Sequence, residues 1–96
     1  MDDDKLHKAQ TDGMRAGLLL NDETFTSAKN SVREELIRLW TVTKSPEERE
    51  KCWQAVNLLD RVMTVLATTH ANGKIAAAEV KSLVEAEQRR KMFGFR

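Results

Sequence analysis

Few side chains in this sequence have the types and spacing that metal binding requires. The candidate ligands are His7, Cys52 and His70. Cys52 and His70 fall on one predicted helix, and at 1.5 Å per residue they lie about 27 Å apart. Two ligands on one helix are normally three or four residues apart. The sequence therefore predicts no metal site, and we expect no cofactor.

Catalytic nucleophiles and bases are equally poorly supported. The four glycines are too dispersed to form a phosphate-binding loop. Asp60 has no His or Lys one turn away on its own helical face, so we interpret it as a solvated carboxylate rather than a general base. Cys52 lies on an apolar face, which favours a buried thiol. We expect no catalytic residue, no enzymatic activity and no small-molecule substrate.

The two tryptophans offer chemistry of another kind, in a chain that has no tyrosine. Trp40 precedes a predicted turn and Trp53 follows it, so both lie near the same end of a helical pair. Trp53 falls outside the apolar face of its helix, beside Asp60 and Asn57. Two interpretations stay open. Trp53 packs under the N-terminal helix or stacks on Arg49, or it is an exposed aromatic anchor for a partner protein.

The C-terminal residues combine four cations with two aromatic rings, in the order Arg89-Arg90-Lys91-Met92-Phe93-Gly94-Phe95-Arg96. Residues 92–96 form a tail beyond the last predicted helix. The rings could enter pockets on another protein. Alternatively, the cations could neutralise phosphates while the rings stack on bases, which makes nucleic acid a candidate partner. A frayed, solvated terminus is the third interpretation.

The helices that position these residues carry strong boundary signals. The segment Ser45-Pro46-Glu47-Glu48 places a Ser N-cap, a Pro at the first helical position and a Glu three residues after the cap. We expect this helix to end near residue 71, because Asn72-Gly73 provides a glycine of the kind that ends helices. The preceding helix begins at Asn21 or Asp22 and reaches about Thr43.

Because two residues separate these helices, the sequence predicts an antiparallel helical hairpin of about 22–43 and 46–71. A shorter N-terminal helix over 3–20 and a C-terminal helix over about 75–91 flank it. Ala9, Gly13 and Gly17 are spaced by four, so they form either a ridge that a second helix can approach closely or the break in a marginal helix. The predicted fold class is all-α, with residues 1–96 as a single domain.

The helix over 46–71 is apolar around half of its circumference, more than one neighbouring helix can cover. We expect one flank to form the core with the preceding helix: Leu36, Leu39, Val56, Leu59, Met63 and Leu66. The other flank, Leu58, Val62 and Val65, is expected to be covered by a second copy of the chain. The predicted partner-binding residues are therefore Trp53, Leu58, Val62, Val65, Arg89, Arg90, Lys91, Phe93 and Phe95.

Composition limits the remaining function classes. The chain has 96 residues, of which 41% are hydrophobic and 32% charged, which favours a folded helical protein over a disordered one. The longest apolar run, 16–20, is too short for a membrane span or a signal sequence. One cysteine suits a reducing compartment. The run Asp2-Asp3-Asp4-Lys5 matches an enteropeptidase-type cleavage sequence, or it supplies acid to a first helical turn.

A resemblance rests on the hairpin residues. The segments Ala16-Gly17-Leu18-Leu19, Asn21-Asp22-Glu23, Trp40-Thr41-Val42-Thr43, Arg49-Glu50-Lys51-Cys52-Trp53, Leu58-Leu59-Asp60-Arg61-Val62 and Gly73-Lys74-Ile75-Ala76 resemble a group of small, mostly uncharacterised tailed-bacteriophage proteins. The shared pattern is a Trp–Thr helix end, an acid-rich turn, an Arg-Glu-x-x-Trp helix start and a closing Gly-Lys. It spans roughly residues 14–78 and implies a phage gene product, located in the virion or the host cytoplasm.

We therefore expect a non-enzymatic phage structural or assembly protein that acts through helix-mediated contacts with itself or with another phage protein. One alternative is a host-takeover protein that binds and inhibits a host factor. The other is a nucleic-acid-binding accessory protein that uses the C-terminal tail.

Overall fold

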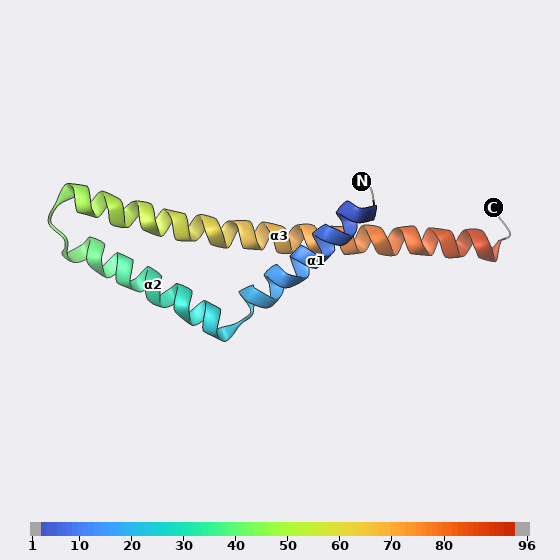
Figure 1. Ribbon diagram of the computed structural model, residues 1–96, viewed down its shortest axis with the longest axis horizontal. Helices are drawn as coiled ribbons and strands as arrows, with labels where there is room; N and C mark the ends of the chain where they lie inside the picture. The colour runs from blue at the N-terminus through green and yellow to red at the C-terminus, as the bar shows by residue number, and fades with distance from the viewer. Residues whose placement is uncertain (1–2, 94–96) are drawn as a thin grey trace.

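Three helices account for nearly all of residues 3–93, the part of the chain that this computed structural model describes (Figure 1). They are α1 (Asp3–Leu20), α2 (Glu23–Val42) and α3 (Pro46–Met92), and residues 3–93 contain no strand. Helices α1 and α2 follow one another along α3, and both run in the opposite direction to it. The predicted all-α class is confirmed.

The start of α2 and the start of α3 lie where the sequence predicts them. An Asp22 side-chain oxygen accepts a hydrogen bond from the Phe25 backbone N–H at 2.8 Å, which caps α2. The Ser45 hydroxyl accepts one from the Glu48 backbone N–H at 3.4 Å, and Pro46 opens α3. Each cap satisfies an N–H that would otherwise lack a helical partner. Both predicted N-caps are confirmed.

The predicted end of this helix at residue 71 is wrong, because α3 continues through Gly73 to Met92 as one helix of 47 residues. At 1.5 Å per residue it is about 70 Å long. Gly73 is buried inside it and serves close helix packing rather than termination. A Cβ on Gly73 would lie 2.6 Å from the Cα of Gly13 in α1, closer than real Cβ atoms approach backbone. The separate helix over 75–91 is therefore the second half of α3.

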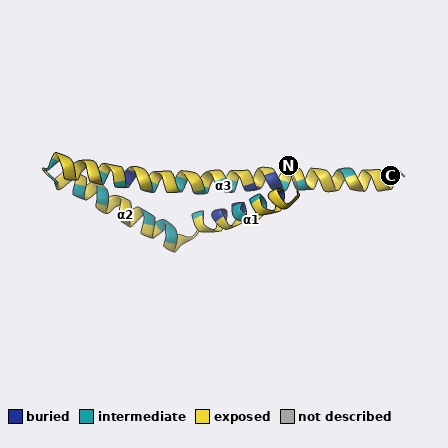
Figure 2. Cartoon of the chain, turned by 45° about the horizontal axis from the view of Figure 1, so that its top comes forward, coloured by how far each residue is buried: buried dark blue, intermediate teal, exposed yellow. Residues whose placement is uncertain are grey.

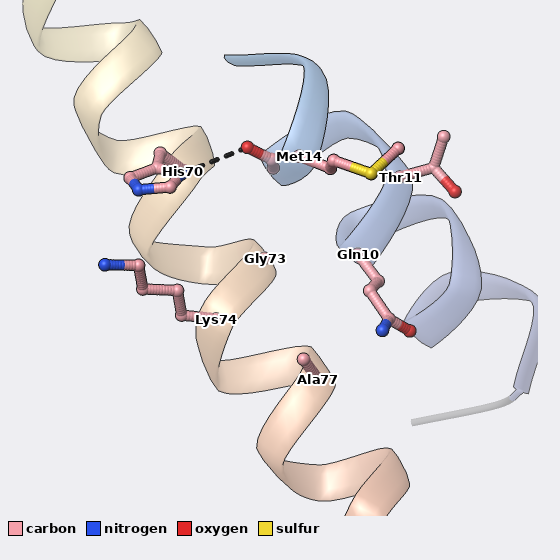
Figure 3. Close-up of a pocket in the computed structure, with 8 residues that line it drawn as sticks. Gln10, Thr11, Met14, His70, Gly73, Lys74 and Ala77 are labelled. Atoms are coloured by element: carbon pink, nitrogen blue, oxygen red, sulfur yellow. Dashed lines mark hydrogen bonds between the residues drawn. The ribbon is translucent and has the colours of Figure 1, made fainter. Parts of the chain in front are cut away.

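The ridge interpretation of the α1 glycines is confirmed. A Cβ on Gly17 would lie 2.6 Å from the His70 ring, so the imidazole occupies the space that a side chain would need. The Nδ1 of His70 lies 3.1 Å from the Gly13 carbonyl oxygen, and a dashed line at His70 marks this hydrogen bond in Figure 3. Since a carbonyl only accepts, Nδ1 is the donor in this hydrogen bond. Gly17, the His70 ring and the Gly13 carbonyl oxygen together fix where α1 crosses α3.

Buried apolar side chains are few in the described chain: Leu6, Ala16, Val56 and Ala76. Of the six expected core residues, Val56 alone is fully buried. The other five are half-buried, so their expected near-complete burial is wrong: Leu36, Leu39, Leu59, Met63 and Leu66. The reason is geometric, because α2 leaves the 43–45 turn beside α3 and then diverges from it (Figures 1 and 2). The pair is therefore more open than the close hairpin that the sequence predicts.

The molecule is a long, thin rod. Its Cα extents are 75 × 25 × 15 Å, and its radius of gyration is 21.1 Å. A compact domain of this length has a radius of gyration of about 13 Å.

Candidate interaction surfaces

Both tryptophans line a shallow hollow at the end of the rod where α2 turns into α3. The hollow has a volume of about 430 Å³ and is lined by Trp40, Pro46, Arg49, Glu50 and Trp53. We call it the tryptophan hollow. Trp40 is 40% exposed and Trp53 is 53% exposed. Two large rings that remain this open at the same place have the composition of a protein-binding hot spot.

Arg49 stacks on Trp40 rather than on Trp53. Its guanidinium carbon lies 4.4 Å from the centroid of the Trp40 ring, within the range of a cation–π interaction. Packing of Trp53 under the N-terminal helix is also absent, because α1 lies over the other half of α3. Of the two interpretations of Trp53, the structure agrees with the exposed aromatic ring.

A second candidate surface is the apolar stripe of Leu58, Val62 and Val65, which are 61%, 47% and 63% exposed. Together with Arg61 and Leu66 they line a shallow depression of about 350 Å³ on α3. Within residues 3–93 this stripe stays open, as the sequence predicts for a single copy. Three large aliphatic side chains in one open row favour a protein contact.

The position of this stripe on α3 explains its composition. Eighteen residues make five helical turns, so Leu58 and Val62 point the same way as Ala76 and Val80 further along. Ala76 is buried under α1 and is 4% exposed. The stripe is therefore the continuation of the face of α3 that α1 covers. Helix α2 packs on the neighbouring face and leaves it uncovered.

The cationic candidates lie at the opposite end of the rod. Arg89, Arg90 and Lys91 form the last turn of α3 and are exposed. Arg90 pairs with Glu87 at 3.4 Å within the helix. Phe93 caps the helix and is 67% exposed. Phe95 lies outside the described residues.

The other candidate residues occupy separate positions. Cys52 is half-buried on α3, and among residues 3–93 no group of three His, Cys, Asp or Glu side chains could hold a metal ion. Asp60 accepts a hydrogen bond from the Arg33 side chain of α2 at 3.3 Å. None of the helices in the described part of the chain is long and apolar enough to cross a membrane.

The partner of the glycine ridge on α3 is not among the residues that the sequence predicts to interact. A ridge such as Gly13 and Gly17 lets a second helix approach closely. On α3, Gly73 lies against Gly13, and the His70 ring occupies the space beside Gly17. The sequence signal for this contact is Gly73 itself, since a glycine inside a helix permits close approach of a second helix as well as helix termination.

Comparison of the chain with protein-family models, with curated proteins and with solved structures finds no match in any of the three.

Proposed function

We propose that this protein is a non-enzymatic structural or assembly component that acts by helix-mediated self-association. The observation that supports this most strongly is the amount of surface that a single copy exposes. The chain has a mass of 10.9 kDa and an accessible surface of 7771 Å². A compact monomer of the same mass exposes about 5,600 Å².

The difference, about 2,200 Å² per chain, is comparable to the area that a subunit buries in an obligate homo-oligomer. The thin core supports the same conclusion, since two of the four apolar side chains buried within residues 3–93 are alanines. Few buried side chains contribute little free energy against the entropy of ordering a rod. A second chain along α2 and the first half of α3 would complete the burial of Leu59, Met63 and Leu66.

The stripe of Leu58, Val62 and Val65 is the surface on which we expect this contact. In the assembled protein, α2 and residues 46–71 of α3 would then act as the antiparallel pair that presents it. The resemblance to tailed-bacteriophage proteins suggests the setting, a virion or an assembly intermediate in the host cytoplasm. Mass spectrometry of purified virions would distinguish this role from that of a host-directed inhibitor.

Sedimentation equilibrium at micromolar concentration tests the proposal. We expect the wild-type chain to form a defined homo-oligomer and Val62→Glu to lower its mass toward that of a monomer, because the new carboxylate would be desolvated in the contact. Asn57→Glu is the matched control, since it adds the same charge to an exposed position outside the stripe. A wild-type chain that stays monomeric, or equal dissociation by both variants, would contradict self-association through this surface.

A further inference from the structure

The tryptophan hollow and the C-terminal end of α3 have complementary chemistry. We propose that the hollow of one copy binds the end of α3 from a second copy, so that chains join end to end. This inference rests on the proposed self-association, but it assigns a second and different contact. The stripe of Leu58, Val62 and Val65 would join copies side by side, and the hollow would join them lengthwise.

The first support for this pairing is the exposed apolar surface at both places. Met92 and Phe93 end α3 with 74% and 67% of their surfaces exposed. Two aliphatic or aromatic side chains of this size match a hollow of about 430 Å³ whose lining includes two indole rings. Arg49 already covers Trp40, and in the described part of the chain the Trp53 ring has no stacked cation. Aromatic pairs and sulfur–aromatic contacts both stabilise a contact of this kind.

The charges near the two surfaces also support the pairing. Arg89 and Arg90 precede Phe93 by four and three residues, so all three share one side of the helix end. Glu50 lines the hollow, and Glu47 lies one turn before it on the same side of α3. Acidic first turns and basic last turns also complement the helix dipole, so these charges alone do not specify a contact. Beside two sets of exposed apolar side chains, they orient one end toward the other.

The two ends cannot meet within one chain. Pro46 and Met92 are the first and last residues of a single helix, and its length of about 70 Å holds them apart. A bound end must therefore come from another copy. Because the two contacting surfaces differ, two joined copies still present one unoccupied hollow and one unoccupied helix end, so the contact repeats into a filament or closes into a ring.

Charge exchange tests this directly. The first variant carries Glu47→Lys and Glu50→Lys, and the second carries Arg89→Glu and Arg90→Glu. In each variant both ends of the rod have the same sign, so we expect lengthwise association to weaken at least tenfold. In an equimolar mixture every contact is again between opposite signs, so assembly should return. A third variant with Lys81→Glu and Lys74→Glu, both exposed and away from the two ends, lowers the net charge by the same amount as the second variant and is its control.

Sedimentation velocity reports the size distribution, and tryptophan fluorescence reports the contact itself. The chain has two tryptophans and no tyrosine, and both tryptophans line the hollow. We expect wild-type emission to shift to shorter wavelength as concentration rises, and the shift to be lost in each variant and restored in the mixture. Circular dichroism verifies that each variant remains helical.

Three outcomes would overturn the inference. Variants that assemble to the same size as wild type would leave the proposed self-association intact but remove the lengthwise contact. A mixture of the two variants that stays dissociated while both remain helical would show that the charges do not face one another. A wild-type chain that is monomeric throughout would reject both proposals together.

Discussion

The two halves of α3 pack in different ways. Around Gly73, α1 crosses on glycine and alanine, the backbones come into contact, and the residues at the crossing are buried without help from another molecule. Along residues 46–66, α3 presents large side chains to a helix that diverges from it, and Leu59 and Leu66 remain half-buried. Small residues thus complete one contact within the chain. The large side chains of the first half have more apolar surface than α2 alone covers.

Substitution of Gly73 by Leu should have the largest effect on the free energy of unfolding, because it disrupts the contact between α1 and α3. Even a Cβ at this position would lie 2.6 Å from the Gly13 backbone, which cannot rotate away as a side chain can. We expect α1 to be displaced and the free energy of unfolding to fall by about 3 kcal/mol, measured by urea denaturation at fixed protein concentration. Ala71→Leu, at an exposed position two residues away, should change it by less than about 0.5 kcal/mol. Equal effects of the two would show that α1 does not need close contact at Gly73.

Truncation of one leucine at each contact, Leu6 where α1 meets α3 and Leu59 where α2 meets α3, sharpens the comparison. Leu6 of α1 is 1% exposed, so Leu6→Ala should cost about 3 kcal/mol at any protein concentration. Leu59 is half-buried in a single chain, so Leu59→Ala should cost about 1–2 kcal/mol in dilute solution. Its cost should rise with concentration if a second copy completes the cover. A cost for Leu59→Ala that is as large in dilute solution as that for Leu6→Ala would mean that α2 already buries this face.

The smallest effect concerns the turn that joins α2 to α3. Ser45 caps α3 through one hydrogen bond of 3.4 Å in an exposed position. Ser45→Ala should therefore lower the free energy of unfolding by about 1 kcal/mol, measured by thermal or urea denaturation. Ser45→Asp retains an acceptor at this position and should keep most of the stability. Loss of stability in both variants would indicate that the hydroxyl has another role.

Features that depend on local chemistry could be predicted from the sequence. Asp22 and Ser45 are caps because their side chains accept from N–H groups within the next turn, and no distant part of the chain is needed. The course of α3 beyond residue 71 could not be predicted in this way. Glycine in a helix costs about 1 kcal/mol relative to alanine, which argues for a helix end. The contact with Gly13, which is distant in sequence, reverses that conclusion.

Of the candidate surfaces, too, some features follow from the local sequence and others depend on how the helices meet. The exposure of Leu58, Val62 and Val65 follows from helical periodicity, because more apolar surface is present than one neighbour covers. The stacking of Arg49 on Trp40 instead of Trp53 depends on how α2 and α3 meet at their turn. The ion pair of Arg33 with Asp60 joins two helices whose mutual rotation the sequence alone does not fix.

Hydrogen–deuterium exchange at two protein concentrations tests the central claim most directly. Amides of α3 near Gly73 should be protected to the same degree at nanomolar and high micromolar concentration, because α1 of the same chain covers them. Amides of residues 52–66 should exchange rapidly in dilute solution and become at least tenfold more protected at high concentration, as a second chain covers the Leu58, Val62 and Val65 stripe. Equal protection of 52–66 at both concentrations would contradict the claim that this half of the helix is completed by another copy.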